Sequence, residues 1–111
     1  MNIWALDKDQ SIRHLLLMLT TQLGAGAFVV DEQTECDRNA VFIHHAEDPA
    51  LRAYLYTVGQ QEGRYGIHLE YPPTSAAAVL FEANENQSLE AVVESLAVHF
   101  DIPVIAPLPS R

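Results

Sequence analysis

The chain has 111 residues, of which 49% are hydrophobic and 19% charged, a balance typical of a folded domain and not of a disordered segment. Fifteen acidic residues against six basic ones give a net charge of −9, which disfavours binding to nucleic acid or to an anionic membrane. With Cys36 as its single cysteine, no basic apolar leader and no apolar run of about 20 residues, we expect one cytoplasmic domain over residues 1–111.

The first predicted unit is a strand, a capped helix and a second strand. Apolar residues at Ile3–Leu6 predict a short buried strand, and Asp9 is the expected cap of the helix that follows. This helix carries apolar residues at i, i+3, i+4, i+7 and i+11, namely Ile12, Leu15, Leu16, Leu19 and Leu23. The Gly-Ala-Gly sequence at 24–26 ends the helix, and Ala27–Val30 is the expected next strand.

The second predicted unit follows the same plan. Ala40–Ile43 predicts a strand, and Asp48-Pro49 supplies a cap and a proline for the first turn of a helix. The apolar stripe of this helix consists of Leu51, Tyr54, Leu55 and Val58. Gly63 ends the helix, and Tyr65–Tyr71 alternates in polarity, which predicts a half-buried strand.

The third predicted unit begins with a strand at Ala78–Phe81 and a helix cap at Asn86. Its helix repeats the spacing of the first one, with Leu89, Val92, Val93, Leu96 and Phe100. Val104–Ala106 is the expected last strand.

The three units repeat one phrase, an apolar run followed by a capped helix, that starts at residues 3, 42 and 80. Together they predict three β-α-β units, each with parallel strands joined by a right-handed crossover. We therefore expect an α/β fold with a mostly parallel sheet of five to six strands and flavodoxin-like layering. The polar residues at the three turns differ, so the repeat predicts architecture and not function.

The stretch from Ile3 to Leu17, I-W-A-L-D-K-D-Q-S-I-R-H-L-L-L, joins an apolar strand to an acidic cluster and a helix. In this order it resembles the opening of response-regulator receiver domains, with Asp7 and Asp9 in the acidic cluster and Ser11-Ile12-Arg13 at the helix start. The length of the chain is also close to that of a receiver. The resemblance implies the layering of a receiver and a regulatory role.

Several positions depart from the receiver pattern. The strand that carries a receiver's phosphate-accepting Asp ends here in His44-His45, and Lys8 stands where a metal-binding acid is usual. A cation at that position competes with Mg²⁺, which requires oxygen ligands. Leu69–Tyr71 and Ala106-Pro107 replace the usual Thr or Ser and the usual Lys-Pro. The resemblance therefore implies a degenerate receiver that lacks a phosphoacceptor and acts by protein contact.

Polar residues follow each predicted strand, and they are our candidate site: Asp7, His44, His45 and Glu82. If the three strands are parallel neighbours, these side chains meet at one rim, an acidic pocket suited to a cation or an amine. His44 and His45 are adjacent on a strand and point to opposite faces, so one metal ion is not expected to bind both. A purely structural role in polar turns is the alternative. We expect no cofactor and no resident metal.

Other reactive groups give weaker signals. Cys36 lies in the acidic stretch D-E-Q-T-E-C-D-R, which disfavours a reactive thiolate. His14 and His99 adjoin the apolar stripes of helices and are expected at the surface or its boundary. The spacing defines no Ser-His-Asp or Cys-His arrangement and no phosphate-binding glycine motif.

The second unit is rich in tyrosine, and with Phe42 these residues predict an interaction surface: Tyr54, Tyr56, Tyr65 and Tyr71. Tyrosine suits such a surface because it combines apolar area with a polar tip. An open sheet edge is a second place at which two copies can pair. We therefore expect a protein partner and a homodimer.

These observations support three hypotheses for function. The leading one is a non-catalytic regulatory or adaptor module that acts by protein–protein interaction. The alternative is a small enzyme, or a ligand- or metal-binding protein, that uses the rim at the strand ends. The third is an acidic mimic of nucleic acid that occupies a basic partner, as the net charge of −9 allows.

Overall fold

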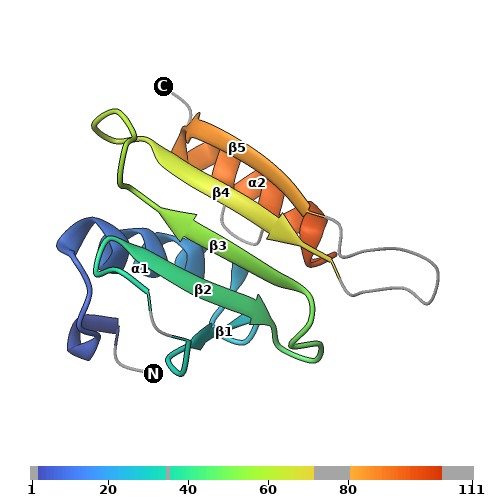
Figure 1. The fold of residues 1–111 in the computed structure, drawn as a ribbon. Coiled ribbons are helices and arrows are strands. Elements are labelled where there is room, and N and C mark those ends of the chain that lie inside the picture. Colours follow the sequence, from blue (N-terminus) through green and yellow to red (C-terminus); the bar gives the residue numbers. More distant parts are fainter. Residues whose placement is uncertain (1–2, 35, 72–80, 104–111) are drawn as a thin grey trace.

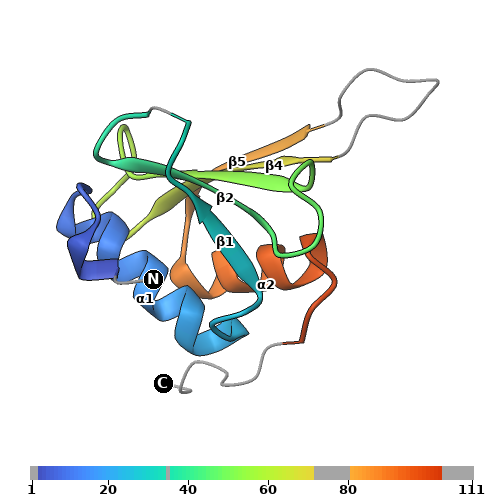
Figure 2. The same ribbon diagram turned by 90° about the horizontal axis from the view of Figure 1, so that it is seen from below.

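The computed structural model of the chain describes residues 3–34, 36–71 and 81–103. One sheet forms the centre of the fold, and both helices lie on the same face of it (Figures 1 and 2). In chain order the elements are a 3-10 helix η1 (Ile3–Ala5), helix α1 (Gln10–Leu23), strands β1 (Phe28–Asp31), β2 (Ala40–His45), β3 (Arg52–Tyr56), β4 (Tyr65–Glu70) and β5 (Phe81–Gln87), and helix α2 (Leu89–His99).

The five described strands lie side by side in chain order, β1-β2-β3-β4-β5, and every neighbouring pair is antiparallel. The predicted α/β architecture, a mostly parallel sheet of five to six strands with receiver-like layering, is therefore wrong. A parallel pair needs a crossover of a dozen or more residues, usually a helix. Between β1 and β4 the chain instead makes short hairpin connections, so each strand returns beside its predecessor.

Helix α1 confirms the first predicted helix. Its stripe of Ile12, Leu15, Leu16, Leu19 and Leu23 is buried, as the 3.6-residue period requires. The helix ends where Gly24 adopts a φ of 102°, a conformation that glycine takes without steric cost. Asp9 occupies the N-cap position, but its side chain makes no capping hydrogen bond.

The second predicted helix is wrong, because residues 52–56 form strand β3. Leu51, Tyr54, Leu55 and Val58 have helical spacing, yet the same segment also alternates as R-A-Y-L-Y, the two-residue period of a strand. The Asp48-Pro49 pair does not start a helix. It forms the turn between β2 and β3, in which the Leu51 amide donates to the Asp48 carbonyl at 3.0 Å.

The first predicted strand and the predicted cap of the last helix are wrong, whereas the last helix itself is confirmed. The expected strand at Ile3–Leu6 is instead the 3-10 helix η1. Asn86 is not a helix cap but lies within β5 with a φ of 52°, and Ser88 caps α2 by accepting a hydrogen bond from the Ala91 amide at 3.1 Å. The third predicted helix is confirmed as α2. The strand predicted at Val104–Ala106 lies outside the described residues, as does all of Ala78–Phe81 except Phe81, which begins β5.

The hydrophobic core lies between the sheet and the two helices. Strand residues that alternate toward the helices are buried, among them Val30, Val41, Ile43, Ala53, Leu55, Ile67 and Leu69. From α2 they meet Val92, Val93, Leu96 and Phe100, the last of which follows its C-terminus. His99 is 7% exposed, and its Nε2 donates to the Arg52 carbonyl at 2.8 Å, so this histidine is more deeply buried than its sequence context predicts. His14 is exposed, in agreement with prediction.

Candidate functional site

The antiparallel sheet does not bring the predicted rim residues together. Asp7 lies between η1 and α1, where its highly exposed carboxylate pairs with Arg38 at 3.1 Å. His44 and His45 end β2, whereas Glu82 belongs to β5, which is separated from β2 by β3 and β4. Glu82 is near the start of β5, at the same end of the sheet as His44, but two strands separate them. The side-by-side strand ends expected of a parallel sheet therefore do not occur.

His44 and His45 lie on opposite faces of the sheet. His44 is in register with Val29 and Arg52 on the face that carries no helix, and its Nδ1 donates to the His45 carbonyl at 2.8 Å. His45 is in register with Phe28 on the helix side, and its ring meets that of Phe100 edge-on at 6.0 Å. The two imidazoles therefore have separate surroundings.

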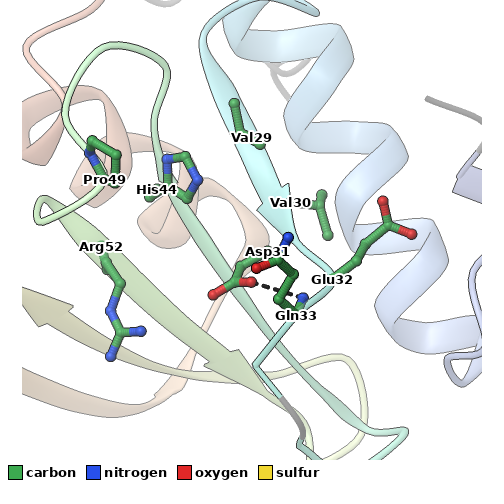
Figure 3. Close-up of a pocket in the computed structure, with 8 residues that line it drawn as sticks. All are labelled: Val29, Val30, Asp31, Glu32, Gln33, His44, Pro49 and Arg52. Carbon is green, nitrogen blue, oxygen red and sulfur yellow. Dashed lines mark hydrogen bonds between the residues drawn. The ribbon is translucent and has the colours of Figure 1, made fainter.

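A hollow of about 420 Å³ lies beside His44 at the β1 side of the sheet (Figure 3). Its polar lining includes His44, Arg52 and Asp31, and its apolar lining comes from β1 and the turn after β2. In Figure 3 the side chain of Glu32 points away from that of Arg52. The hollow is shallow and open, so it is not the enclosed, mostly apolar cavity in which small-molecule sites are usually found.

Asp31 is held by its own turn. Its Oδ1 accepts the amides of Gln33 at 2.9 Å and Thr34 at 3.1 Å, and its Oδ2 accepts the Thr34 hydroxyl at 2.6 Å. The Thr34 hydroxyl is the main cause that lowers the pKa of Asp31, with smaller help from the two amides and from the charge of Arg52, while burial opposes the shift. An ionised carboxylate engaged in this way stabilises the turn and is poorly suited to act as a general base.

The face of the sheet opposite α1 and α2 carries a cluster of rings from three neighbouring strands: Phe42 on β2, Tyr54 and Tyr56 on β3, and His68 on β4. We call this cluster the aromatic face. Tyr54 lies at its centre, with ring centroids 4.7 Å from Phe42, 5.4 Å from Tyr56 and 5.8 Å from His68. Tyr56 is buried, while Phe42, Tyr54 and His68 are each half-buried. Because residues directly opposite in an antiparallel pair share a face, the strand register places these rings together.

Gly66 makes room for the ring of Tyr56. The two residues are opposite each other in the β3–β4 register, and a Cβ atom at position 66 would lie 2.1 Å from Tyr56 Cζ. The Tyr56 hydroxyl then reaches His68 Nε2 at 3.3 Å. The ring thus packs over the glycine of the neighbouring strand and is almost fully buried.

Arg52 adds a cation to one side of the aromatic face. Its Nε and Nη2 both donate to Glu70 Oε1, at 3.0 Å and 2.8 Å, and its guanidinium carbon lies 4.5 Å from the centroid of the Phe42 ring. The side chains of Arg52 and Glu70 are 31% and 26% exposed. This arrangement combines an ion pair with a cation–π contact.

Acidic residues lie near the two tyrosines at both flanks of the aromatic face, in the β1–β2 connection and on β5. Burial is the main cause that raises the pKa of Tyr54, and the nearness of Cys36 and Asp37 in the β1–β2 connection raises it further. The pKa of Tyr56 is raised first by burial and then by Glu85 on β5. Glu85 Oε2 also accepts from Gln60 Nε2 at 2.7 Å, which links β5 to the β3–β4 connection. Both phenols are therefore neutral near pH 7.

Cys36 has a partner that its local sequence does not reveal. Lys8, 28 residues earlier, places its Nζ 3.2 Å from Cys36 Sγ and 3.1 Å from the Asp37 carbonyl oxygen. The surroundings of the thiol therefore include a positive charge from Lys8 as well as the acidic residues next to Cys36 in the sequence. Lys8 fastens the β1–β2 connection to the segment before α1.

The rings of the aromatic face were predicted in part. The tyrosine content predicted an interaction surface, but Tyr65 and Tyr71 do not belong to this cluster: Tyr65 faces the core, and the Tyr71 ring contacts His99. Tyr54 and Tyr56 belong together because they are two residues apart on a strand. The alternation in R-A-Y-L-Y, bounded by a proline turn and a glycine-containing loop, is the signal that would have placed them on one face, but the segment was predicted to be a helix.

Among residues 3–34, 36–71 and 81–103, no group of three or more His, Cys, Asp or Glu side chains is placed to hold a metal ion. No helix in this part of the chain is long and apolar enough to cross a membrane. No protein-family model, curated protein or solved structure matches the chain. Function is therefore inferred from the geometry of the aromatic face.

Proposed function

We propose that this protein is a non-catalytic binding module that contacts another protein through the aromatic face. The observation that supports this proposal is the side-by-side placement of four rings on a sheet face that no described helix covers. Tyrosine and other aromatic residues are enriched at protein interfaces, and rigid rings lose little conformational entropy on binding. A cytoplasmic location belongs to the same proposal, because a chain with one cysteine needs no oxidising compartment.

The packing of the aromatic face also favours contact over chemistry. Tyr56 bonds to His68, Arg52 bonds to Glu70, and the Asp31 carboxylate is engaged by its turn. A catalytic group needs a free donor or acceptor directed at a substrate. The enzyme hypothesis depended on strand ends that converge, and these do not, so we do not propose it.

Affinity capture from a native lysate tests the proposal. Immobilised wild-type protein is compared with Tyr54→Thr, which removes the central ring but keeps a residue suited to a strand. Val98→Ala is the matched control, because Val98 is a large apolar residue that is 82% exposed on α2, away from the aromatic face. Circular dichroism and thermal melting establish that each variant is folded.

We expect a set of proteins that the wild type and Val98→Ala retain and that Tyr54→Thr loses by at least about tenfold, the effect of one interface hot spot. If folded Tyr54→Thr retains the same proteins in the same amounts as the wild type, the aromatic face is not the contact surface and the proposal fails.

A further inference from the structure

We propose, building on the function proposed above, that the partner segment that docks on the aromatic face is basic, with arginine or lysine side chains stacked on its rings. The inference names the chemistry of the partner. It is carried by ring geometry, by the intramolecular contact of Arg52 and by the distribution of charge around the rings.

The aromatic face already binds one guanidinium. Arg52 lies over the Phe42 ring at 4.5 Å, the geometry by which the negative π face of an aromatic ring attracts a cation. Tyr54 presents a second half-buried ring 4.7 Å from Phe42. A second guanidinium from outside therefore finds the same kind of surface beside the first.

Carboxylates flank the rings on both sides. Asp37, in the β1–β2 connection, is close enough to Tyr54 for an electrostatic interaction, and Glu85 on β5 is likewise close enough to Tyr56. Both residues are exposed, so their charges reach a bound partner. Among the five described strands, Arg52 is the single lysine or arginine, and Glu70 neutralises it. Two cations lie close to Asp37: Arg38 pairs with Asp7 at 3.1 Å, and Lys8 lies 3.1 Å from the Asp37 carbonyl oxygen. The charge that favours a cation is therefore chiefly that of Glu85 on the β5 side, together with the net charge of −9.

The same charges disfavour other occupants. A second copy placed face to face would bring Asp37 and Glu85 of both chains together around one interface, where like charges repel. An acidic segment would meet the same repulsion. A basic segment gains from both the rings and the carboxylates.

A defined peptide tests the inference. The probe is a short peptide of alternating arginine and serine, whose arginines share one side when the chain is extended. Its control is the same peptide with citrulline in place of arginine, which keeps the shape and removes the charge. Binding is followed by the amide and ring resonances of ¹⁵N- and ¹³C-labelled full-length protein at about 0.01 M ionic strength, where screening is weak.

We expect the arginine peptide to shift the resonances of Phe42, Tyr54, Tyr56 and His68, and the citrulline peptide to bind far more weakly. Tyr54→Thr should lower the affinity about fivefold, the effect of one exposed cation–π contact. The pair Asp37→Asn and Glu85→Gln should also weaken binding, while Glu94→Gln, which removes an exposed charge from α2, should not.

The inference is overturned by equal binding of the citrulline peptide, by shifts spread over α1 and α2, or by an affinity that Tyr54→Thr leaves unchanged. If the arginine peptide fails but lysate proteins are still lost by Tyr54→Thr, the proposed function stands and the basic partner does not. If neither peptide nor lysate proteins depend on Tyr54, the proposed function itself has failed. A light-scattering mass twice that of one chain, lost in Tyr54→Thr, identifies a second copy as the occupant and also overturns the inference.

Discussion

The ring of Tyr56 occupies the space that any side chain at position 66 would need. A Cβ atom there would lie 2.1 to 2.6 Å from three ring carbons, closer than van der Waals contact allows. We expect Gly66→Ala to lower the free energy of unfolding by about 1–3 kcal/mol, measured by chemical denaturation, because the ring must be displaced.

Gly26→Ala is the matched control for this substitution. No heavy atom lies within 4 Å of a Cβ at position 26, so the change should leave stability the same or raise it slightly through a less flexible unfolded chain. Equal effects of the two substitutions would show that Tyr56 does not lie against Gly66.

Asp31 makes the stability of the fold depend on pH in the acidic range. Its pKa is lower in the folded state than the ordinary value of 3.8, chiefly because the Thr34 hydroxyl bonds to the carboxylate. The ionised form therefore favours folding; its contribution is complete above the ordinary value and is lost as the pH falls through the lower folded value. We expect the wild type to melt above Asp31→Asn near pH 7 and the difference to shrink at about pH 2.

Thr34→Val provides an independent check on the same carboxylate. Loss of the hydroxyl should raise the pKa of Asp31 toward its ordinary value, as followed by an NMR titration of the side chain. A melting difference between wild type and Asp31→Asn that is the same at both pH values would contradict the assignment.

At the scale of elements, the two main helices begin differently. Ser88 accepts from the Ala91 amide at 3.1 Å, whereas Asp9 occupies the N-cap of α1 without a side-chain bond. We expect Ser88→Ala to lower the free energy of unfolding by about 1 kcal/mol and Asp9→Ala to lower it by clearly less. Denaturant titration of both variants decides the point, and a larger loss for Asp9→Ala would reverse the assignment of the working cap.

Elements whose pattern extends over several turns were predictable from sequence. The apolar stripes that predicted α1 and α2 each span twelve residues, and only a helix places all their members on one side. Residues 51–58 are too short for this, and their helical spacing coincides with the alternation of a strand. The packing of the segment against β2 and β4 favours the strand, and local sequence does not contain that information.

The whole molecule shows why the candidate site was only partly predictable. Tyrosine content predicted that these residues gather on one surface, but membership of the aromatic face depends on register, which aligns Phe42 with Tyr54 and Tyr54 with His68. The predicted rim required three neighbouring parallel strands. Each described strand is instead antiparallel to its neighbour, and the residues predicted to form the rim lie apart. The hydrogen bond between Lys8 and Cys36 joins parts of the chain that are 28 residues apart, and no local sequence motif predicts it.

The helices that cover the sheet come from the two ends of the described chain, while the strands between them follow one another in order. A nascent chain that stops before Leu89 already contains all five described strands but lacks α2, which packs against β4 and β5. Ile67 and Leu69, the core residues of β4, would then lack the part of the core that α2 supplies. Such a chain presents the apolar surface that chaperones bind, so during translation the sheet depends on protection until its last helix has emerged.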